Sequence, residues 1–139
     1  MAEFPGIENV DPEQRQAQRA LTEALWSKLE EQGVDDRTAG RIECQFYAKD
    51  IAAVRALLPA FPGWERNIGT VWERNGGTVD DAPGELSITL VSPLVHLSRE
   101  AFLELVDVAL IAARQSSCVF DGFQVDMSTL VKRPWWRFW

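Results

Sequence analysis

The side chains best suited to catalysis are few in this chain of 139 residues, and they are widely separated. His96 is the single histidine, and Ser92 and Ser98 are its nearest hydroxyl-bearing neighbours. A histidine base needs a nucleophile or an acid within hydrogen-bonding distance, and no Gly-x-Ser-x-Gly elbow surrounds either serine. Cys44 and Cys118 are too few and too far apart for a zinc site, which needs four closely arranged ligands. We therefore expect no enzyme activity, no metal and no cofactor.

Two groups of residues are better suited to binding another protein. Acidic side chains lie on the expected first helix and in a loop, and tryptophans gather in the tail at residues 131–139, which has three basic residues and no acid. Tryptophan and arginine dominate the energetics of protein interfaces, and acidic surfaces attract basic segments. The expected partner-binding residues are Glu23, Glu30, Glu31, Asp80, Asp81, Trp135, Trp136 and Trp139.

Each group also has a simpler interpretation. The acidic helix can be an ordinary solvated surface. The tryptophans can fold back onto the protein itself, because large aromatic side chains are unfavourable in water, or they can anchor the tail at a membrane surface. The position of the tail tryptophans is the observation that separates these possibilities.

Composition narrows the class of partner and the compartment. The net charge is −7 and the isoelectric point is near 4.7, which disfavours direct nucleic-acid binding because phosphates need a basic surface. No apolar run approaches the roughly 20 residues that span a bilayer, and the first residues do not resemble a signal peptide. We expect a cytoplasmic protein with two free thiols and no membrane partner.

The apolar patterns predict alternating helices and strands. A first helix begins at the cap Asp11 and ends near Gly33, with Ala17, Leu21, Ala24, Leu25 and Leu29 as its expected inward face. Strands are expected over residues 41–49, 64–73, 86–91 and 118–127, the last with a bulge at Asp121-Gly122. Asp50 caps a short helix, and Ser98 caps a long one with an apolar stripe from Phe102 to Ala113.

The order strand–helix–strand–strand–helix–strand predicts an α+β fold, a ferredoxin-like βαββαβ sandwich with a four-stranded antiparallel sheet and two helices. The additions are an N-terminal helix and the aromatic C-terminal tail. We expect a flexible arm over residues 1–10 and one domain over residues 11–139. The first helix and the tail are the segments available to cover the second face of the sheet, and a homodimer through that face is the alternative to a monomer.

Three short segments resemble a known family. Gly33-Val34-Asp35-Asp36, the strand residues 41–47 and Phe120-Asp121-Gly122-Phe123 together resemble the regulator of ribonuclease E activity B family. The chain differs from that family at Cys44, where histidine is usual, and in its basic tryptophan-rich tail. The resemblance implies a ferredoxin-like, non-catalytic protein that binds the scaffold region of ribonuclease E and modulates RNA decay.

The leading hypothesis is thus a protein-binding regulator that holds a basic segment of its partner. One alternative is an immunity protein that neutralises a cognate toxin, since such proteins are also small, acidic and inactive. The second alternative is a small-molecule-binding domain or an enzyme of the same fold, which requires a pocket near His96 or Tyr47.

Overall fold

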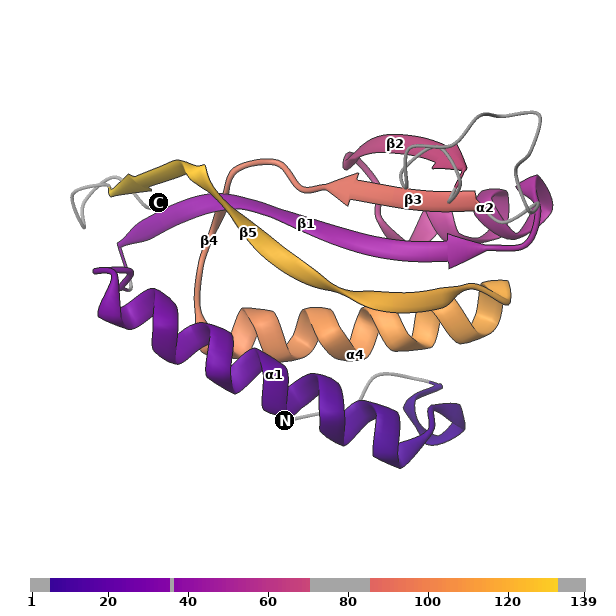
Figure 1. The fold of residues 1–139 in the computed structure, drawn as a ribbon, viewed down its shortest axis with the longest axis horizontal. Coiled ribbons are helices and arrows are strands. Elements are labelled where there is room, and N and C mark those ends of the chain that lie inside the picture. The colour runs from indigo at the N-terminus through magenta and orange to yellow at the C-terminus, as the bar shows by residue number, and fades with distance from the viewer. Residues whose placement is uncertain (1–5, 36, 71–85, 133–139) are drawn as a thin grey trace.

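The computed structural model describes residues 6–35, 37–70 and 86–132, and it confirms the α+β class (Figure 1). The described elements in chain order are η1 (Ile7–Asn9), α1 (Pro12–Glu31), β1 (Thr38–Ala48), α2 (Ile51–Leu57), η2 (Leu58–Ala60), β2 (Glu65–Thr70), β3 (Leu86–Val91), β4 (Val95–His96), α4 (Arg99–Ser116) and β5 (Val119–Lys132). The sheet lies on α4, and α1 lies on the far side of α4 from the sheet.

The described strands form one antiparallel sheet around β1. β1 pairs with β3 on one side and with β5 on the other, and β2 pairs with the outer side of β3. We expected four strands. The fifth, β4, has two residues and pairs with Ala39 and Gly40 of β1. A strand this short has no alternating pattern of its own, so it has no signature in the sequence.

The predicted inward faces of β1 and α4 are confirmed. Ile42, Cys44, Phe46 and Ala48 of β1 are buried, as are most residues of the apolar stripe on α4. The ring centroid of Phe46 lies 5.6 Å from that of Phe61 and 5.2 Å from that of Phe120. Because Phe61 follows η2 and Phe120 lies at the start of β5, these aromatic contacts join distant parts of the chain in one core.

The bulge predicted at Asp121-Gly122 is confirmed. Gly122 pairs with Gln45, whereas Phe120 pairs with the next residue of β1, so Asp121 is an extra residue in β5. Gly122 has a φ of +135°, a conformation that glycine adopts without strain. The bulge keeps both Phe120 and Phe123 on the side of the sheet that faces α4.

β5 is longer than predicted and makes a second, wider irregularity opposite Gly40. Ala39 pairs with Val131 but Arg41 pairs with Asp126, so several residues of β5 bulge away from β1. The Asp126 carboxylate accepts a hydrogen bond from the Ser128 amide (3.0 Å), which closes this turn. A Cβ atom on Gly40 would lie 2.8 Å from Leu130 Cδ2, so a larger residue here would require the Leu130 side chain to shift.

The predicted inward face of α1 is wrong for three of its five residues. Leu21 is 65% exposed, and Ala17 and Ala24 are also exposed. The buried and half-buried residues of α1 are offset around the helix, and they are Arg15, Gln18, Arg19, Thr22, Glu23, Leu25, Trp26 and Leu29. The helix therefore buries a partly polar face, which an argument from apolar spacing alone cannot find.

An ion-pair cluster between α1 and α4 explains that polar face. Arg15 donates two hydrogen bonds to the buried Asp107 carboxylate, from Nε to Oδ1 (2.9 Å) and from its terminal nitrogen to Oδ2 (3.0 Å). Arg19 lies 3.5 Å from the same carboxylate. We call these three residues the Asp107 cluster. The cluster fixes α1 on α4. The helix is therefore not available to cover the second face of the sheet, which differs from our expectation.

Residues 6–10, the described part of the expected flexible arm, pack against the body of the protein. Ile7 and Val10 are buried among residues of the core, and η1 packs against α4. Two isolated apolar residues in a segment with glycine and proline breakers have no periodicity, so their burial depends on the surface that α4 provides.

We predict that Asp107→Asn lowers the free energy of unfolding by roughly 2 kcal/mol, because two half-buried guanidinium groups lose their charged partner. The matched control is Glu104→Gln, which removes an exposed carboxylate one turn earlier on α4 and is expected to change the stability by less than about 0.5 kcal/mol. Urea unfolding at neutral pH measures both. Equal effects from the two variants would contradict the structural role of the cluster.

We predict that Cys44 makes stability depend on pH in the alkaline range. Burial raises the pKa of the Cys44 thiol from its ordinary value of 9.0 to about 12. Below about pH 9 the thiol is neutral in both the folded and the unfolded protein. Above that pH the thiol ionises only in the unfolded protein. The free energy of unfolding therefore falls by up to about 1.4 kcal/mol per pH unit.

Urea titrations at several values between about pH 8 and about pH 10.5 measure this slope. Cys44→Ala should lower the stability at every pH and reduce the alkaline slope. Cys118→Ala is the comparison that keeps the Cys44 contribution. An unchanged slope in Cys44→Ala would show that this thiol ionises freely in the folded protein.

Candidate functional site

The residues around His96 have structural roles. His96 is exposed on β4, opposite Ala39. The Ser92 hydroxyl donates a hydrogen bond to the Pro93 carbonyl (2.8 Å) and accepts one from the Ile42 amide (2.8 Å). The Ser98 hydroxyl accepts one from the Ala101 amide (3.0 Å) as the predicted cap of α4. Both hydroxyls therefore stabilise the turns on either side of β4.

The structure separates the three acidic residues expected on α1. Glu23 forms an ion pair with Arg99 in the first turn of α4, with 2.9 Å between Arg99 Nε and Glu23 Oε2. This hydrogen bond lowers the pKa of Glu23 below its ordinary value. Glu23 thus makes a contact between two helices of the protein itself, and its partner-binding role stays a prediction.

Glu30 and Glu31 are exposed in the last turn of α1, away from that ion pair. Negative charges are unfavourable there, because the carbonyl groups at a helix C-terminus already carry partial negative charge. The fold has no stabilising use for these two carboxylates in the described contacts. The other expected binding residues, Asp80, Asp81, Trp135, Trp136 and Trp139, lie outside the described residues.

The sheet face turned away from α4 is polar. Side chains on β1 form hydrogen bonds with those of other strands. The pairs are Arg41 with Glu65 of β2 (3.3 Å), Glu43 with Gln124 of β5 (2.9 Å) and Gln45 with Thr89 of β3 (3.0 Å). Such cross-strand pairs satisfy one another next to solvent. This part of the face therefore does not need the apolar cover that we expected the first helix or the tail to provide.

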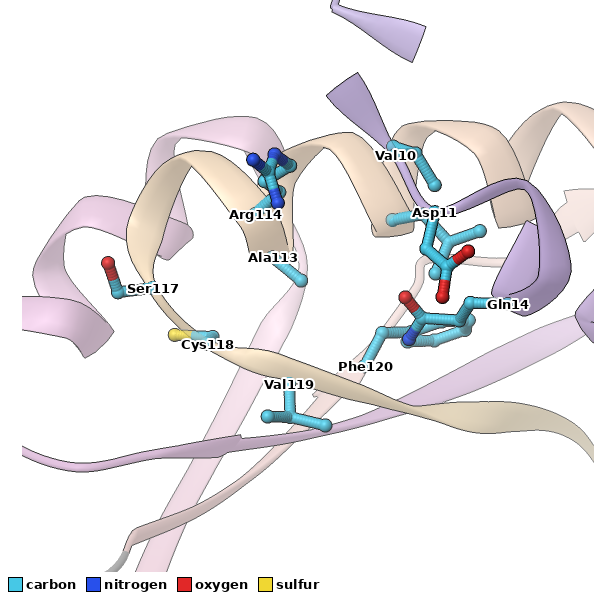
Figure 2. Close-up of a pocket in the computed structure, with 10 residues that line it drawn as sticks. Val10, Asp11, Gln14, Ala113, Arg114, Ser117, Cys118, Val119 and Phe120 are labelled. Atoms are coloured by element: carbon cyan, nitrogen blue, oxygen red, sulfur yellow. The ribbon is translucent and has the colours of Figure 1, made fainter. Parts of the chain in front are cut away.

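A hollow of about 330 Å³ opens elsewhere, where the start of α1, the end of α4 and the start of β5 meet (Figure 2). We call it the junction pocket. It is lined by Val10, Asp11, Gln14, Leu110, Ala113, Arg114, Ser117, Cys118, Val119 and Phe120. Figure 2 shows Asp11 and Gln14 on one side and Arg114 on the other. Apolar and polar side chains line it in similar measure, and a concave site of this size is a candidate for ligand binding.

The walls of the junction pocket are held by contacts outside it. Asp11 caps α1 by accepting a hydrogen bond from the Glu13 amide (3.0 Å) through one carboxylate oxygen, Oδ1. Val10 is buried beside α4, and Phe120 is buried against Phe46. Because these residues belong to the core, the pocket is formed before any ligand arrives.

Ser117 marks a strained backbone at the rim. It is the C-cap of α4 and has a φ of +62°, the only positive φ of a residue other than glycine in the described chain. Helices commonly end with glycine in this conformation, because a side chain there is unfavourable. The reversal lets the chain turn directly into β5, and the Cys118 amide donates to the Ala113 carbonyl (2.8 Å).

The polar groups at the rim can form hydrogen bonds or ion pairs with a ligand, but they are poorly suited to covalent chemistry. Burial raises the pKa of the Cys118 thiol, and its sulfur lies 3.6 Å from the Ala53 carbonyl oxygen. The neutral thiol is a weak nucleophile. Asp11 keeps one carboxylate oxygen outside its capping bond, and Arg114 has no hydrogen bond or ion pair through its side chain among the described contacts.

Sequence reasoning missed this pocket. Asp11 was identified as a helix cap and Cys118 as a free thiol, and neither role brings the two together. Residues 10–14 and 110–120 are distant in the chain, and only the packing of α1 on α4 makes them neighbours. The nearest signal in the sequence is Ser117 at the end of a helix, where glycine is usual.

Comparison with known proteins leaves the family open. No model of a protein family matches the chain, and a search of curated proteins finds no match. The resemblance to the regulator of ribonuclease E activity B family therefore remains a prediction. Within the described segments, no helix has the length and apolar character to cross a bilayer, and no group of three or more His, Cys, Asp or Glu residues is placed to hold a metal ion.

We predict that Ser117→Gly stabilises the protein, by up to about 1 kcal/mol, because glycine adopts the left-handed conformation without the clash of a side chain. Ser116→Gly is the matched control. The Ser116 hydroxyl is buried and donates to the Ala112 carbonyl (2.7 Å), so this variant should destabilise. Thermal unfolding measures both. A loss of stability in Ser117→Gly would show that the serine side chain is itself required.

Proposed function

We propose that this chain is a non-catalytic, protein-binding regulator that holds a basic segment of its partner, with one apolar side chain of that segment in the junction pocket. The observation that carries the proposal is the preformed hollow of about 330 Å³, which is lined by both apolar and polar side chains. Interfaces concentrate their binding energy where an anchor side chain fills such a pocket.

Negatively charged groups in and near the pocket can contact a basic segment. Asp11 lies at the rim, and Asp50 is close enough to Cys118 to raise the pKa of its thiol. The carbonyl groups at the C-terminus of α4 add partial negative charge beside Ser117. Arg114 is the opposing cation, and it can bind an acidic group or a carbonyl of the same segment.

We further propose that the four longer strands and the helices α2 and α4 form a ferredoxin-like sandwich. The order β2-β3-β1-β5 with antiparallel neighbours supports this topology, and β4 is then a short extension between β3 and α4. The resemblance to the inhibitors of ribonuclease E points in the same direction. The two free, buried cysteines fit a reducing cytoplasm.

Two alternatives predict other ligands for the same surface. An immunity protein would bind one toxin tightly, and the gene of that toxin would lie next to its own. A small-molecule-binding domain is favoured by the size of the junction pocket, although this pocket is lined by neither His96 nor Tyr47. If a small molecule competed with the protein partner for binding, both ligands would occupy the junction pocket.

The test uses the purified chain and the purified scaffold region of ribonuclease E as the probe, with binding measured by biolayer interferometry at low and high salt. We expect salt-sensitive binding, and slower cleavage of a model RNA by ribonuclease E when the chain is added. Gln14→Trp, which fills the pocket from its rim, should weaken binding by about tenfold or more.

Gln32→Trp is the matched control, since it places the same side chain on an exposed position just beyond the other end of α1. Asp11→Asn keeps a capping side chain and removes the charge, so it should reduce the salt dependence. Absence of binding by the unaltered chain would overturn the proposed partner. Equal binding by Gln14→Trp and the unaltered chain would overturn the pocket as the site.

A further inference from the structure

We infer that the outward side of α1 binds the same helix of a second copy of this chain, with the two helices antiparallel. The inference goes beyond the proposed function and does not depend on it. It starts from the orientation of α1, which the Asp107 cluster and Trp26 fix on α4. In that orientation Ala17, Leu21 and Ala24 face solvent, although their apolar spacing predicts that they lie in the core.

The outward side has an apolar centre and charged ends. Its residues are all exposed, and they are Glu13, Ala17, Ala20, Leu21, Ala24, Lys28 and Glu31. Leu21 is 65% exposed, which is the highest value among the exposed large hydrophobic residues of the described chain. A leucine at the middle of a helix and in open water is unfavourable, and burial of a whole leucine side chain is worth about 1.5–3 kcal/mol.

The charges select the direction and register of the pair. An antiparallel arrangement that sets Ala20 against Leu21 of the second copy also sets Ala17 against Ala24 and Glu13 against Lys28. By two-fold symmetry each of these contacts occurs twice. The alanines allow the helix axes to approach to the short end of the usual 8–10 Å range. Opposite charges then meet at both ends, and the two helix dipoles are also opposed.

Other arrangements lose this complementarity. A parallel pair would place Glu13 beside Glu13 and Lys28 beside Lys28. An antiparallel pair shifted by about one turn would place Glu13 beside Glu31. In the selected arrangement the N-terminal ends of the two helices lie at opposite ends of the pair, so the two junction pockets are far apart and both can bind.

The test measures the oligomeric state of the full chain by sedimentation velocity, from about 1 µM to about 1 mM because the contact area is small. We expect a concentration-dependent dimer. Leu21→Asp should weaken it by about tenfold or more. The matched control, Ile51→Asp, makes the same kind of change at an exposed position of α2 and should leave the dimer intact. Circular dichroism checks that each variant is folded.

Charge exchange tests the register. Glu13→Lys and Lys28→Glu should each be monomeric alone, because each places like charges together at both ends. Mixed with one another, the two variants should associate, because both end contacts are again between opposite charges. A monomer at every concentration, an equal loss in Ile51→Asp, or no association in the mixture would overturn the inference.

Discussion

One buried carboxylate determines where the first helix lies. The inward face of α1 is polar in its N-terminal half and apolar in its C-terminal half. Asp107 of α4 holds the first half through Arg15 and Arg19, and the edge-to-face contact of Trp26 with Phe102 holds the second. An unpaired charge at either position would be unfavourable near the core, so the cluster restricts α1 to one rotation about its axis.

The junction pocket follows from that placement. Once α1 is fixed on α4, its preceding residues 7–10 pass over the end of α4 and bury Ile7 and Val10. The abrupt turn at Ser117 then brings β5 back beneath them. The pocket is thus the space left where three elements end or begin, and its polar groups are those that cap or terminate these elements. In the proposed function such groups would serve the fold and a ligand at the same time, whereas the neutral thiol of Cys118 offers little for covalent chemistry.

The same placement relates the two proposals to one another. The inward and pocket-facing residues of α1 organise the body of the protein, and the outward residues remain for association. A dimer through the outward side would present two junction pockets to one partner, and linked sites gain apparent affinity without any new contact. A regulator that holds a flexible, basic segment of a larger enzyme would benefit from this arrangement, since each pocket is small.

Local patterns in the sequence determined most of the secondary structure. The alternation in β1, the caps Asp11, Asp50 and Ser98 and the bulge at Asp121-Gly122 depend on neighbours a few residues away, and all are present in the structure. The rotation of α1, the burial of Ile7 and Val10, the two-residue strand β4 and the junction pocket were decided by tertiary structure. Each depends on contacts between residues far apart in the chain, such as Arg15 with Asp107, and no spacing along the sequence encodes such a pair.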